Sequence, residues 1–156
     1  MVRWKPVSSA NGGSAHDDYY TTPDVFQRLG LHFDLDVCAP KGGVSWIPAD
    51  RHYSIEDDGL AQPWAGRVWM NPPYSNPTPW MARFLAHGDG VCLVPVSRGR
   101  WYAEAWDRLD AMTLCPLQIG FVKPSGQKAK VFMPTFFGAL GASNVRALRN
   151  FERRVR

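Results

Sequence analysis

The stretch "VWMNPPYSNPTPWMARFLAHGDGVCLVPV", residues 68–96, decides the fold that we expect for this chain. Its first three residues are apolar and are typical of a short buried strand, which stops at Asn71. Residues 78–88 predict a helix that ends at Gly88. Residues 90–96 are almost wholly apolar and predict a second core strand. Strand, helix and strand in this order indicate an α/β fold with a mostly parallel sheet.

The rest of the chain continues this alternation. "TPDVFQRLG" predicts a short helix over residues 24–29, because Pro23 precedes it and Gly30 follows it. "LHFDLDVCA", residues 31–39, alternates polar and apolar residues and predicts a strand. Residues 40–66 are rich in turn formers and predict mostly loop, with at most one short strand or helical turn. The remaining elements are a helix over residues 100–109 and closing strands over residues 111–115, 117–123 and 128–140, the last two joined by the turn "PSGQ" as an antiparallel edge hairpin.

Composition bounds the number of domains and the compartment. The chain has 156 residues, which suits one compact domain. We expect a flexible arm over residues 1–16, the folded domain over residues 17–141, and a basic tail over residues 142–156. No stretch approaches the roughly 20 apolar residues of a membrane span, so we expect a cytoplasmic protein. The three cysteines lack metal-site spacing and predict free thiols and no metal.

Polar residues follow the predicted strands where each strand ends. Asp36 ends the strand predicted within residues 31–39 and precedes a loop of small residues, the Asp57-Asp58 pair precedes Gly59, and Asn71 ends the strand before the first proline. In open sheets of parallel strands, ligands bind beyond the carboxyl ends of the strands. These side chains are therefore expected to converge on one cleft.

The unit Asn-Pro-Pro-Tyr suits the binding of an aromatic amine. Asn71 offers an amide oxygen, and Pro73 has no N–H that would compete for the Pro72 carbonyl. Two neighbouring acceptors match an NH₂ group that has two protons to donate. Tyr74 adds a flat face for a planar base, and the prolines hold the groups in fixed relation. The alternative is a turn that merely ends the strand.

At this point the sequence resembles a known family. "NPPY" resembles the catalytic motif of S-adenosylmethionine-dependent amino-methyltransferases. The order of "TP", "FDLDVCA", "DGL" and "NPPY" between Asp17 and Gly141 resembles the small phage and prophage Dam-like DNA adenine-N6 methyltransferases. The resemblance implies a compact variant of the Rossmann-like methyltransferase fold, with S-adenosyl-L-methionine as cofactor. It also implies methylation of adenine N6 in DNA, in a bacterium or a phage-infected cell.

The resemblance also implies roles for individual residues. Thr22 and Pro23 match a motif at the methionine end of the cofactor. Asp36 matches the carboxylate that attracts the cofactor's amino group. Asp58 matches the carboxylate that accepts a hydrogen bond from the amino group of the cofactor's adenine, and Asp57 is the alternative candidate for that role. The implied cofactor-binding residues are Tyr20, Thr21, Thr22, Pro23, Asp36, Cys38, Ala39, Asp58, Leu60 and Asn71. The implied catalytic residues are Asn71, Pro72, Pro73 and Tyr74.

Each role has a plainer alternative. Asp36 could be an exposed residue at a strand end, and the acidic pair could lie in a solvated loop. Thr22 could cap the helix that Pro23 opens. The residue that contacts the cofactor ribose is not obvious, with Asp50 as a weak candidate.

The implied mechanism is direct methyl transfer to N6, which donates to the Asn71 oxygen and the Pro72 carbonyl. The target adenine of duplex DNA must be flipped out of the helix. Tyr74 is expected to stack on one face of the base. Phe121 and Phe132 are candidates for the other face, with a place in the core as the alternative.

DNA binding needs positive charge at the same rim, and the chain has a formal charge of +4. Arg98 and Arg100 follow a core strand and are expected to contact phosphates of double-stranded DNA. Lys123 and Lys128, which flank the closing hairpin together with Lys130, are expected to do the same. The arginines of the tail either bind DNA or form a solvated surface; they are Arg146, Arg149, Arg153, Arg154 and Arg156.

Other functions share these motifs. Enzymes that methylate RNA adenine, cytosine N4 or a protein glutamine use a similar site. A catalytically silent DNA-binding module of the same fold also stays open, because the segment between the first acidic motif and "DGL" is short.

Overall fold

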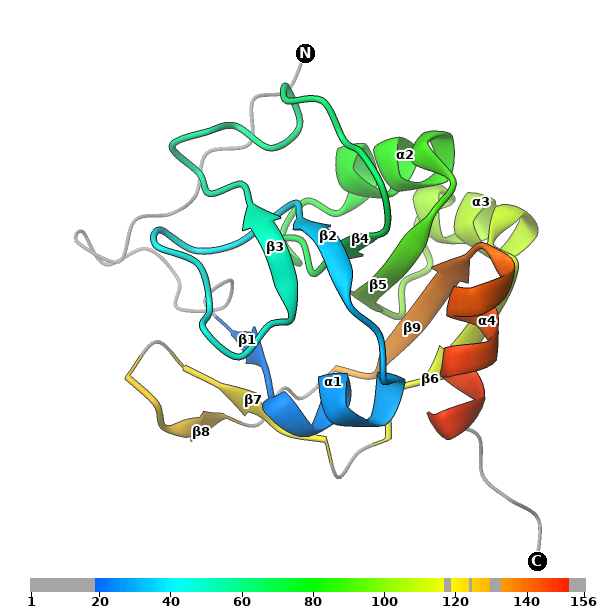
Figure 1. Ribbon diagram of the computed structural model, residues 1–156. Helices are drawn as coiled ribbons and strands as arrows, with labels where there is room; N and C mark the ends of the chain where they lie inside the picture. The colour runs from blue at the N-terminus through cyan, green and yellow to red at the C-terminus, as the bar shows by residue number, and fades with distance from the viewer. Residues whose placement is uncertain (1–18, 117–118, 124, 130–132, 152–156) are drawn as a thin grey trace, which may run out of the picture.

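The computed structural model describes residues 19–116, 119–123, 125–129 and 133–151, which form two sheets and four α-helices (Figure 1). The elements are β1 (Tyr20–Thr21), α1 (Pro23–Leu29), β2 (Phe33–Asp36), β3 (Ala49–His52), β4 (Val68–Met70), α2 (Thr78–His87), β5 (Gly90–Pro95), α3 (Arg100–Arg108), β6 (Ala111–Leu114), β7 (Phe121–Val122), β8 (Lys128–Ala129), β9 (Thr135–Leu140), α4 (Ala142–Leu148) and a 3₁₀ helix (Arg149–Phe151). The predicted arm over residues 1–16 lies outside the described residues.

The larger sheet has six strands in the order β3-β2-β4-β5-β9-β6. The first four are parallel neighbours. Asp36 at the end of β2 lies opposite His52 of β3 on one side and Trp69 of β4 on the other. The carboxyl ends of these three strands therefore meet at one edge of the sheet, where a ligand site is expected.

The antiparallel part of the sheet comes from the C-terminal half of the chain. β9 lies between β5 and β6 and runs antiparallel to both, with Gly90 opposite Leu140 and Ala111 opposite Ala139. The structure confirms the predicted α/β class with a mostly parallel sheet and antiparallel C-terminal strands.

The structure differs from the prediction for residues 128–140, which form two strands instead of one. β8 pairs with β7 through a turn at Gly126, and β7 also pairs with β1, which makes a separate sheet of three short strands. β9 instead enters the main sheet, because all six of its residues are buried and need cover on both faces. The predicted hairpin turn is correct, but the hairpin is not an edge of the main sheet.

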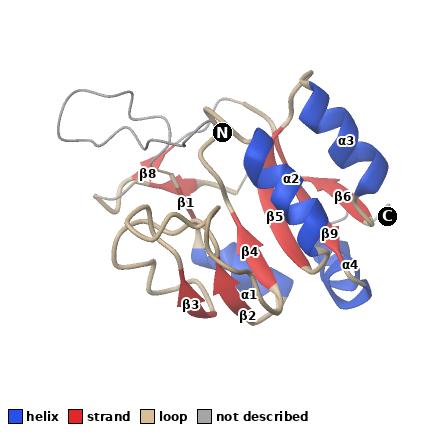
Figure 2. Cartoon of the chain, turned by 90° about the horizontal axis from the view of Figure 1, so that it is seen from above, coloured by secondary structure: helices blue, strands red, loops and turns tan. Residues whose placement is uncertain are grey.

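Helices cover both faces of the main sheet (Figure 2). Neighbouring residues of β5 point to opposite faces, since Val91 packs with α1 and α4 whereas Cys92 packs with α2 and α3. The core therefore has two halves, one on each side of the strands. None of the described helices is long and apolar enough to span a membrane.

The segment after β9 packs on the body of the protein. Ala147, Leu148 and Phe151 are buried in the same half of the core as α1. The Arg28 guanidinium lies 4.6 Å from the centroid of the Phe151 ring, and Arg28 and Asn150 exchange hydrogen bonds through their side chains and carbonyls. Arg153, Arg154 and Arg156 lie outside the described residues.

Candidate active site

Asp36 ends β2 with a buried carboxylate. Its side chain is 3% exposed, and its Oδ1 accepts a hydrogen bond of 3.2 Å from the Cys38 N–H. Burial raises the pKa of Asp36 to about 7, and this hydrogen bond offsets only part of the rise. Within the described chain, no cation pairs with this carboxylate. Asp36 is therefore not an exposed strand-end residue, and its surroundings favour a positively charged ligand.

The turn after Asp36 is held against β3. The Ala39 N–H donates to the Tyr53 carbonyl, and the Tyr53 N–H donates to the Asp36 carbonyl, both at 2.8 Å. Gly59 packs against the same turn, since a Cβ at this position would overlap the Val37 carbonyl oxygen. The "DGL" segment thus lies beside the end of β2, although the two are more than twenty residues apart in the sequence.

The structure distinguishes the two neighbouring acidic residues. The Asp57 carboxylate accepts hydrogen bonds from the Ser54 N–H at 2.7 Å and the Ser54 hydroxyl at 2.9 Å, which lower the pKa of Asp57. Asp58 has a left-handed backbone, with φ of 56°, and is exposed. No described side chain or N–H binds the Asp58 carboxylate. Asp57 therefore holds the loop, whereas Asp58 is available to a ligand.

Asn71 and the two prolines follow β4 directly, beside Asp36. The Asn71 Nδ2 donates to the Tyr19 carbonyl and to the Thr21 Oγ1, each at 3.3 Å. Among the described residues, nothing donates to the Asn71 Oδ1 or to the Pro72 carbonyl. The Pro73 carbonyl accepts from the Asn76 N–H at 3.2 Å and closes the turn. Two acceptors thus remain for a ligand, as the Asn-Pro-Pro unit predicts.

Tyr74 places its hydroxyl in the interior of the protein. The hydroxyl is buried and has no hydrogen-bond partner among the described residues, and burial raises its pKa well above the usual value. The thiols of Cys92 and Cys115 lie close enough to raise this pKa further. The hydroxyl is therefore not available to a ligand at the surface, and any contact with a base would have to come from the ring.

The segment before α1 completes the site from a distant part of the sequence. Thr22 is the N-cap residue of α1, but its hydroxyl makes no capping hydrogen bond. The Thr22 Oγ1 is buried and has no partner in the part of the chain that the structure describes, so a hydroxyl is left for a ligand. Thr21 is 1% exposed, and its carbonyl accepts a hydrogen bond of 2.8 Å from the Trp46 Nε1.

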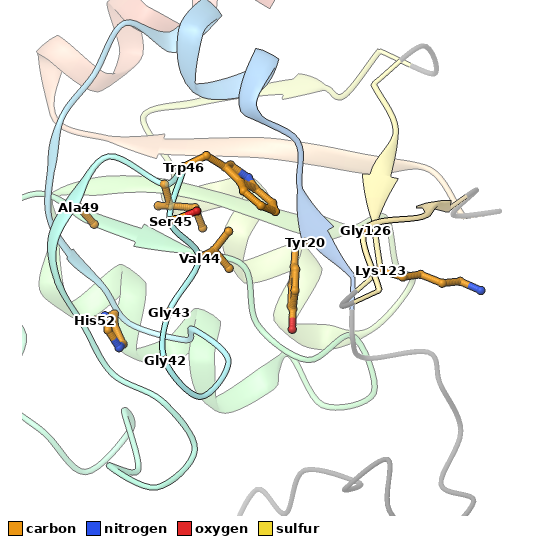
Figure 3. A pocket seen from close by; sticks show the side chains of 11 residues that line it. Tyr20, Gly42, Gly43, Val44, Ser45, Trp46, Ala49, His52, Lys123 and Gly126 are labelled. Carbon is orange, nitrogen blue, oxygen red and sulfur yellow. The ribbon is translucent and has the colours of Figure 1, made fainter.

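A pocket of about 500 Å³ adjoins this segment (Figure 3). Its lining includes Tyr20 of β1, Val44 and Trp46 of the loop before β3, His52 and Lys123. Asp36 and Asn71 are not part of the lining, and of the predicted site residues that the structure describes, only Tyr20 and Lys123 line the pocket. Sequence reasoning missed Trp46, for which a lone Trp in a glycine-rich loop is a weak signal.

The remaining predicted residues lie at several places. Phe121 is 4% exposed and belongs to the hydrophobic core, which was the alternative to stacking on the target base. The Asp50 Oδ1 lies 2.7 Å from the Nε2 of His32 on the surface. Phe132 and Lys130 lie outside the described residues. Four exposed cations make no ion pair with a described residue; they are Arg98, Arg100, Lys123 and Lys128.

Comparison with known proteins agrees with this geometry. The family model described as "DNA N-6-adenine-methyltransferase (Dam)" matches residues 9–132. The chain belongs to this family. It is also similar to the DNA N-6-adenine-methyltransferase of Haemophilus phage HP1 (strain HP1c1), with 34% identity over 86 residues. The match covers 51% of this chain and 48% of the phage protein, so the chain spans about half the length of that relative.

Membership of the Dam family confirms the predicted relationship and the methyltransferase fold, and it implies the use of S-adenosylmethionine. The described residues fit this cofactor. Asp36 is a buried carboxylate that pairs with no described cation, which suits an ammonium group. The orphan Thr22 hydroxyl and the free Asp58 carboxylate suit further polar groups. The Dam motifs thus supply complementary polar atoms at one edge of the sheet.

Proposed function

We propose that this chain transfers a methyl group from S-adenosylmethionine to the exocyclic N6 of adenine in DNA. One observation carries the proposal: the Asn71 Oδ1 and the Pro72 carbonyl receive no hydrogen bond from any described residue, and they follow the strand whose Trp69 lies opposite the buried Asp36. Membership of the Dam family also supports adenine N6 in DNA as the group that receives the methyl.

The two acceptors act on the attacking nitrogen. When N6 donates one proton to Asn71 and one to Pro72, its lone pair is directed away from the adenine ring and toward the methyl group. The same oxygens stabilise the positive charge that develops on N6 during transfer. The bound cofactor supplies an activated methyl group, so the protein needs to orient the amine and exclude water.

The transfer is direct, without a covalent enzyme intermediate. Cys92 and Cys115 lie near Tyr74, but burial raises the pKa of the Cys92 thiol to about 12 and that of Cys115 to about 11. A thiol that stays protonated is a poor nucleophile. This argues against a mechanism that attacks a ring carbon through cysteine.

The cofactor is held by residues from four segments. Asp36 binds the ammonium group, Asp58 accepts from the adenine amino group, and Thr22 donates or accepts at the methionine end. Tyr20, Pro23, Cys38, Ala39 and Leu60 line the same region. This arrangement is supported by the burial of the Asp36 carboxyl and by the Thr22 hydroxyl, which has no hydrogen-bond partner among the described residues.

Double-stranded DNA is the proposed substrate, with the target adenine flipped into the cleft. Arg98 and Arg100 follow the carboxyl end of β5, at the same edge of the sheet as Asn71. Lys123 and Lys128 lie on the β7–β8 hairpin. These four exposed cations would bind phosphates on either side of the cleft. The proposed setting is the cytoplasm of a bacterium or of a phage-infected cell.

The decisive experiment is the transfer of labelled methyl to unmethylated duplex DNA, followed by digestion to nucleosides. We expect label in N6-methyladenine, and a loss of at least about 100-fold in kcat for Asn71→Ala. Asn76→Ala is the matched control, because only the Asn76 backbone N–H is used to close the turn.

The other products of this assay distinguish the alternatives. Label in N4-methylcytosine, or label only in RNA or protein, would replace adenine in DNA as the acceptor. A wild-type protein that binds DNA but neither binds the cofactor nor transfers methyl would be the silent binding module.

A further inference from the structure

The Asn71 amide can adopt two orientations that occupy nearly the same space. A rotation of 180° about its terminal bond exchanges Oδ1 and Nδ2. Only one orientation presents Oδ1 to the target amine. The other presents an NH₂ group, which would repel the N6 protons. Catalysis as proposed above therefore needs something that selects between them.

The atoms that contact the amide make this selection. The Tyr19 carbonyl is an acceptor only, and it lies 3.3 Å from Nδ2. The Thr21 Oγ1 lies at the same distance from Nδ2 and accepts the second proton. In the flipped orientation, Oδ1 would face the Tyr19 carbonyl oxygen, which has no proton to share. The Tyr19 carbonyl therefore selects the orientation that turns Oδ1 away from Tyr19 and leaves it free for the target amine. The Thr21 hydroxyl can donate as well as accept, so it adds a second bond to Nδ2 that holds the amide in the selected orientation.

Thr21 is itself held in place by a third segment. Its carbonyl accepts from the Trp46 Nε1 at 2.8 Å, and its backbone pairs with Phe121 of β7. The Trp46 indole lies against β1 (Figure 3). With 1% exposure, the Thr21 side chain has little surface left for a cofactor or a base.

We propose that Thr21 is a positioning residue that acts through Asn71, with Trp46 as the anchor of its strand. This inference rests on the proposed function, and it assigns Thr21 a role other than cofactor contact. Both contacts to Nδ2 are longer than the usual 2.9–3.0 Å of N–H···O bonds. Such bonds often tighten only when the substrate is bound. Loss of one acceptor is then expected to affect the reaction more than the resting structure.

Three substitutions isolate the hydroxyl of Thr21. Thr21→Ser keeps the hydroxyl and loses the methyl group, Thr21→Val keeps the shape and loses the hydroxyl, and Thr21→Ala loses both. We expect Thr21→Val and Thr21→Ala to lower kcat roughly tenfold, which is about the effect of losing one hydrogen bond, and Thr21→Ser to remain near wild type. The dissociation constant for the cofactor should stay within about twofold in all three.

These variants distinguish a failure of the role of Thr21 from a failure of the proposed methyltransferase function. If wild type methylates adenine but the Val and Ala variants match it, Thr21 does not position Asn71. A cofactor dissociation constant that rises as kcat falls would show that Thr21 is a cofactor contact instead. Loss of activity in Thr21→Ser as well as in Thr21→Val and Thr21→Ala would indicate that the Thr21 side chain acts through packing.

A second measurement does not depend on activity. In ¹⁵N-labelled protein, the side-chain amide signals of Asn71 are assigned by their absence in Asn71→Ala. We expect Thr21→Val and Thr21→Ala to shift these signals and Thr21→Ser to leave them near their wild-type positions. Unchanged signals in the Val and Ala variants would overturn the inference, even for a protein with no methyltransferase activity.

Discussion

The Asp57 carboxylate accepts hydrogen bonds from both the backbone N–H and the hydroxyl of Ser54, whereas the neighbouring Asp58 carboxylate binds no described residue. Two adjacent acidic residues therefore have different tasks. We expect Asp58→Gly, which tolerates the left-handed backbone at this position, to weaken cofactor binding roughly tenfold with little change in the midpoint of urea unfolding. Asp57→Ala should lower that midpoint, because the loop loses both hydrogen bonds.

Calorimetric titration of the cofactor and urea unfolding of both variants check this pair. The assignment fails if Asp57→Ala weakens binding while its unfolding midpoint is that of wild type.

Asp36 predicts a pH dependence of cofactor affinity. Its pKa is about 7 without a ligand because the carboxyl is buried, so it is increasingly protonated below this pH. An ammonium group needs the ionised carboxylate. The cofactor dissociation constant should therefore rise about tenfold for each pH unit below 7 and level off above it. Titrations between pH 5 and about pH 8.5 measure this, and Asp36→Asn should bind weakly at every pH.

Asp36 also predicts a pH dependence of folding stability, which is greater at low pH, whereas cofactor affinity is greater at high pH. A raised pKa means that the folded state binds a proton more tightly than the unfolded chain does. The contribution of Asp36 to stability therefore falls as the pH rises from about 4 to 7. Asp36→Asn removes this penalty, so the variant should be more stable than wild type by a few kcal/mol at pH 8 and similar at pH 4. Equal stabilities at pH 8 would contradict the burial of an ionisable carboxyl.

Tyr74→Phe separates the ring from the hydroxyl. The hydroxyl is buried and no described residue bonds to it, which costs about 1–3 kcal/mol, so Tyr74→Phe should raise the free energy of unfolding by about 1 kcal/mol. If the ring alone contacts the base, kcat should stay within about twofold of wild type. Urea unfolding and the methyl-transfer assay test both parts. A large loss of kcat in Tyr74→Phe would mean that the hydroxyl acts in the reaction.

The basic rim predicts a change in the salt dependence of DNA binding. Arg98 and Arg100 are exposed at the edge that carries Asn71. Replacing both with Gln should reduce the slope of log Kd against log salt by about one for each phosphate contact that is lost. The control is Arg146→Gln with Arg149→Gln, which removes the same charge from the segment after β9. An equal effect of the control would place the DNA contacts elsewhere.

Most of the helices, strands and motifs could be predicted from short stretches of the sequence. The apolar runs before Asn71 and after Gly88 predicted β4 and β5, and Pro23 and Gly30 bounded α1 to within a residue, because strand burial and helix ends depend on short segments. The Asn-Pro-Pro unit also supplied its two neighbouring acceptors without a structure, an amide oxygen and a carbonyl, and the Pro73 nitrogen has no proton to offer that carbonyl in any fold.

Only the tertiary structure decided which polar groups are already bound and which remain free. The sequence could not choose between Asp57 and Asp58, because the choice depends on a turn that brings Ser54 to one carboxylate. Nor could it show that Thr21 contacts Asn71, fifty positions away, or that Trp46 anchors Thr21. Hydrogen bonds between distant segments depend on the packing of the sheet as a whole, and no local pattern of residues encodes them.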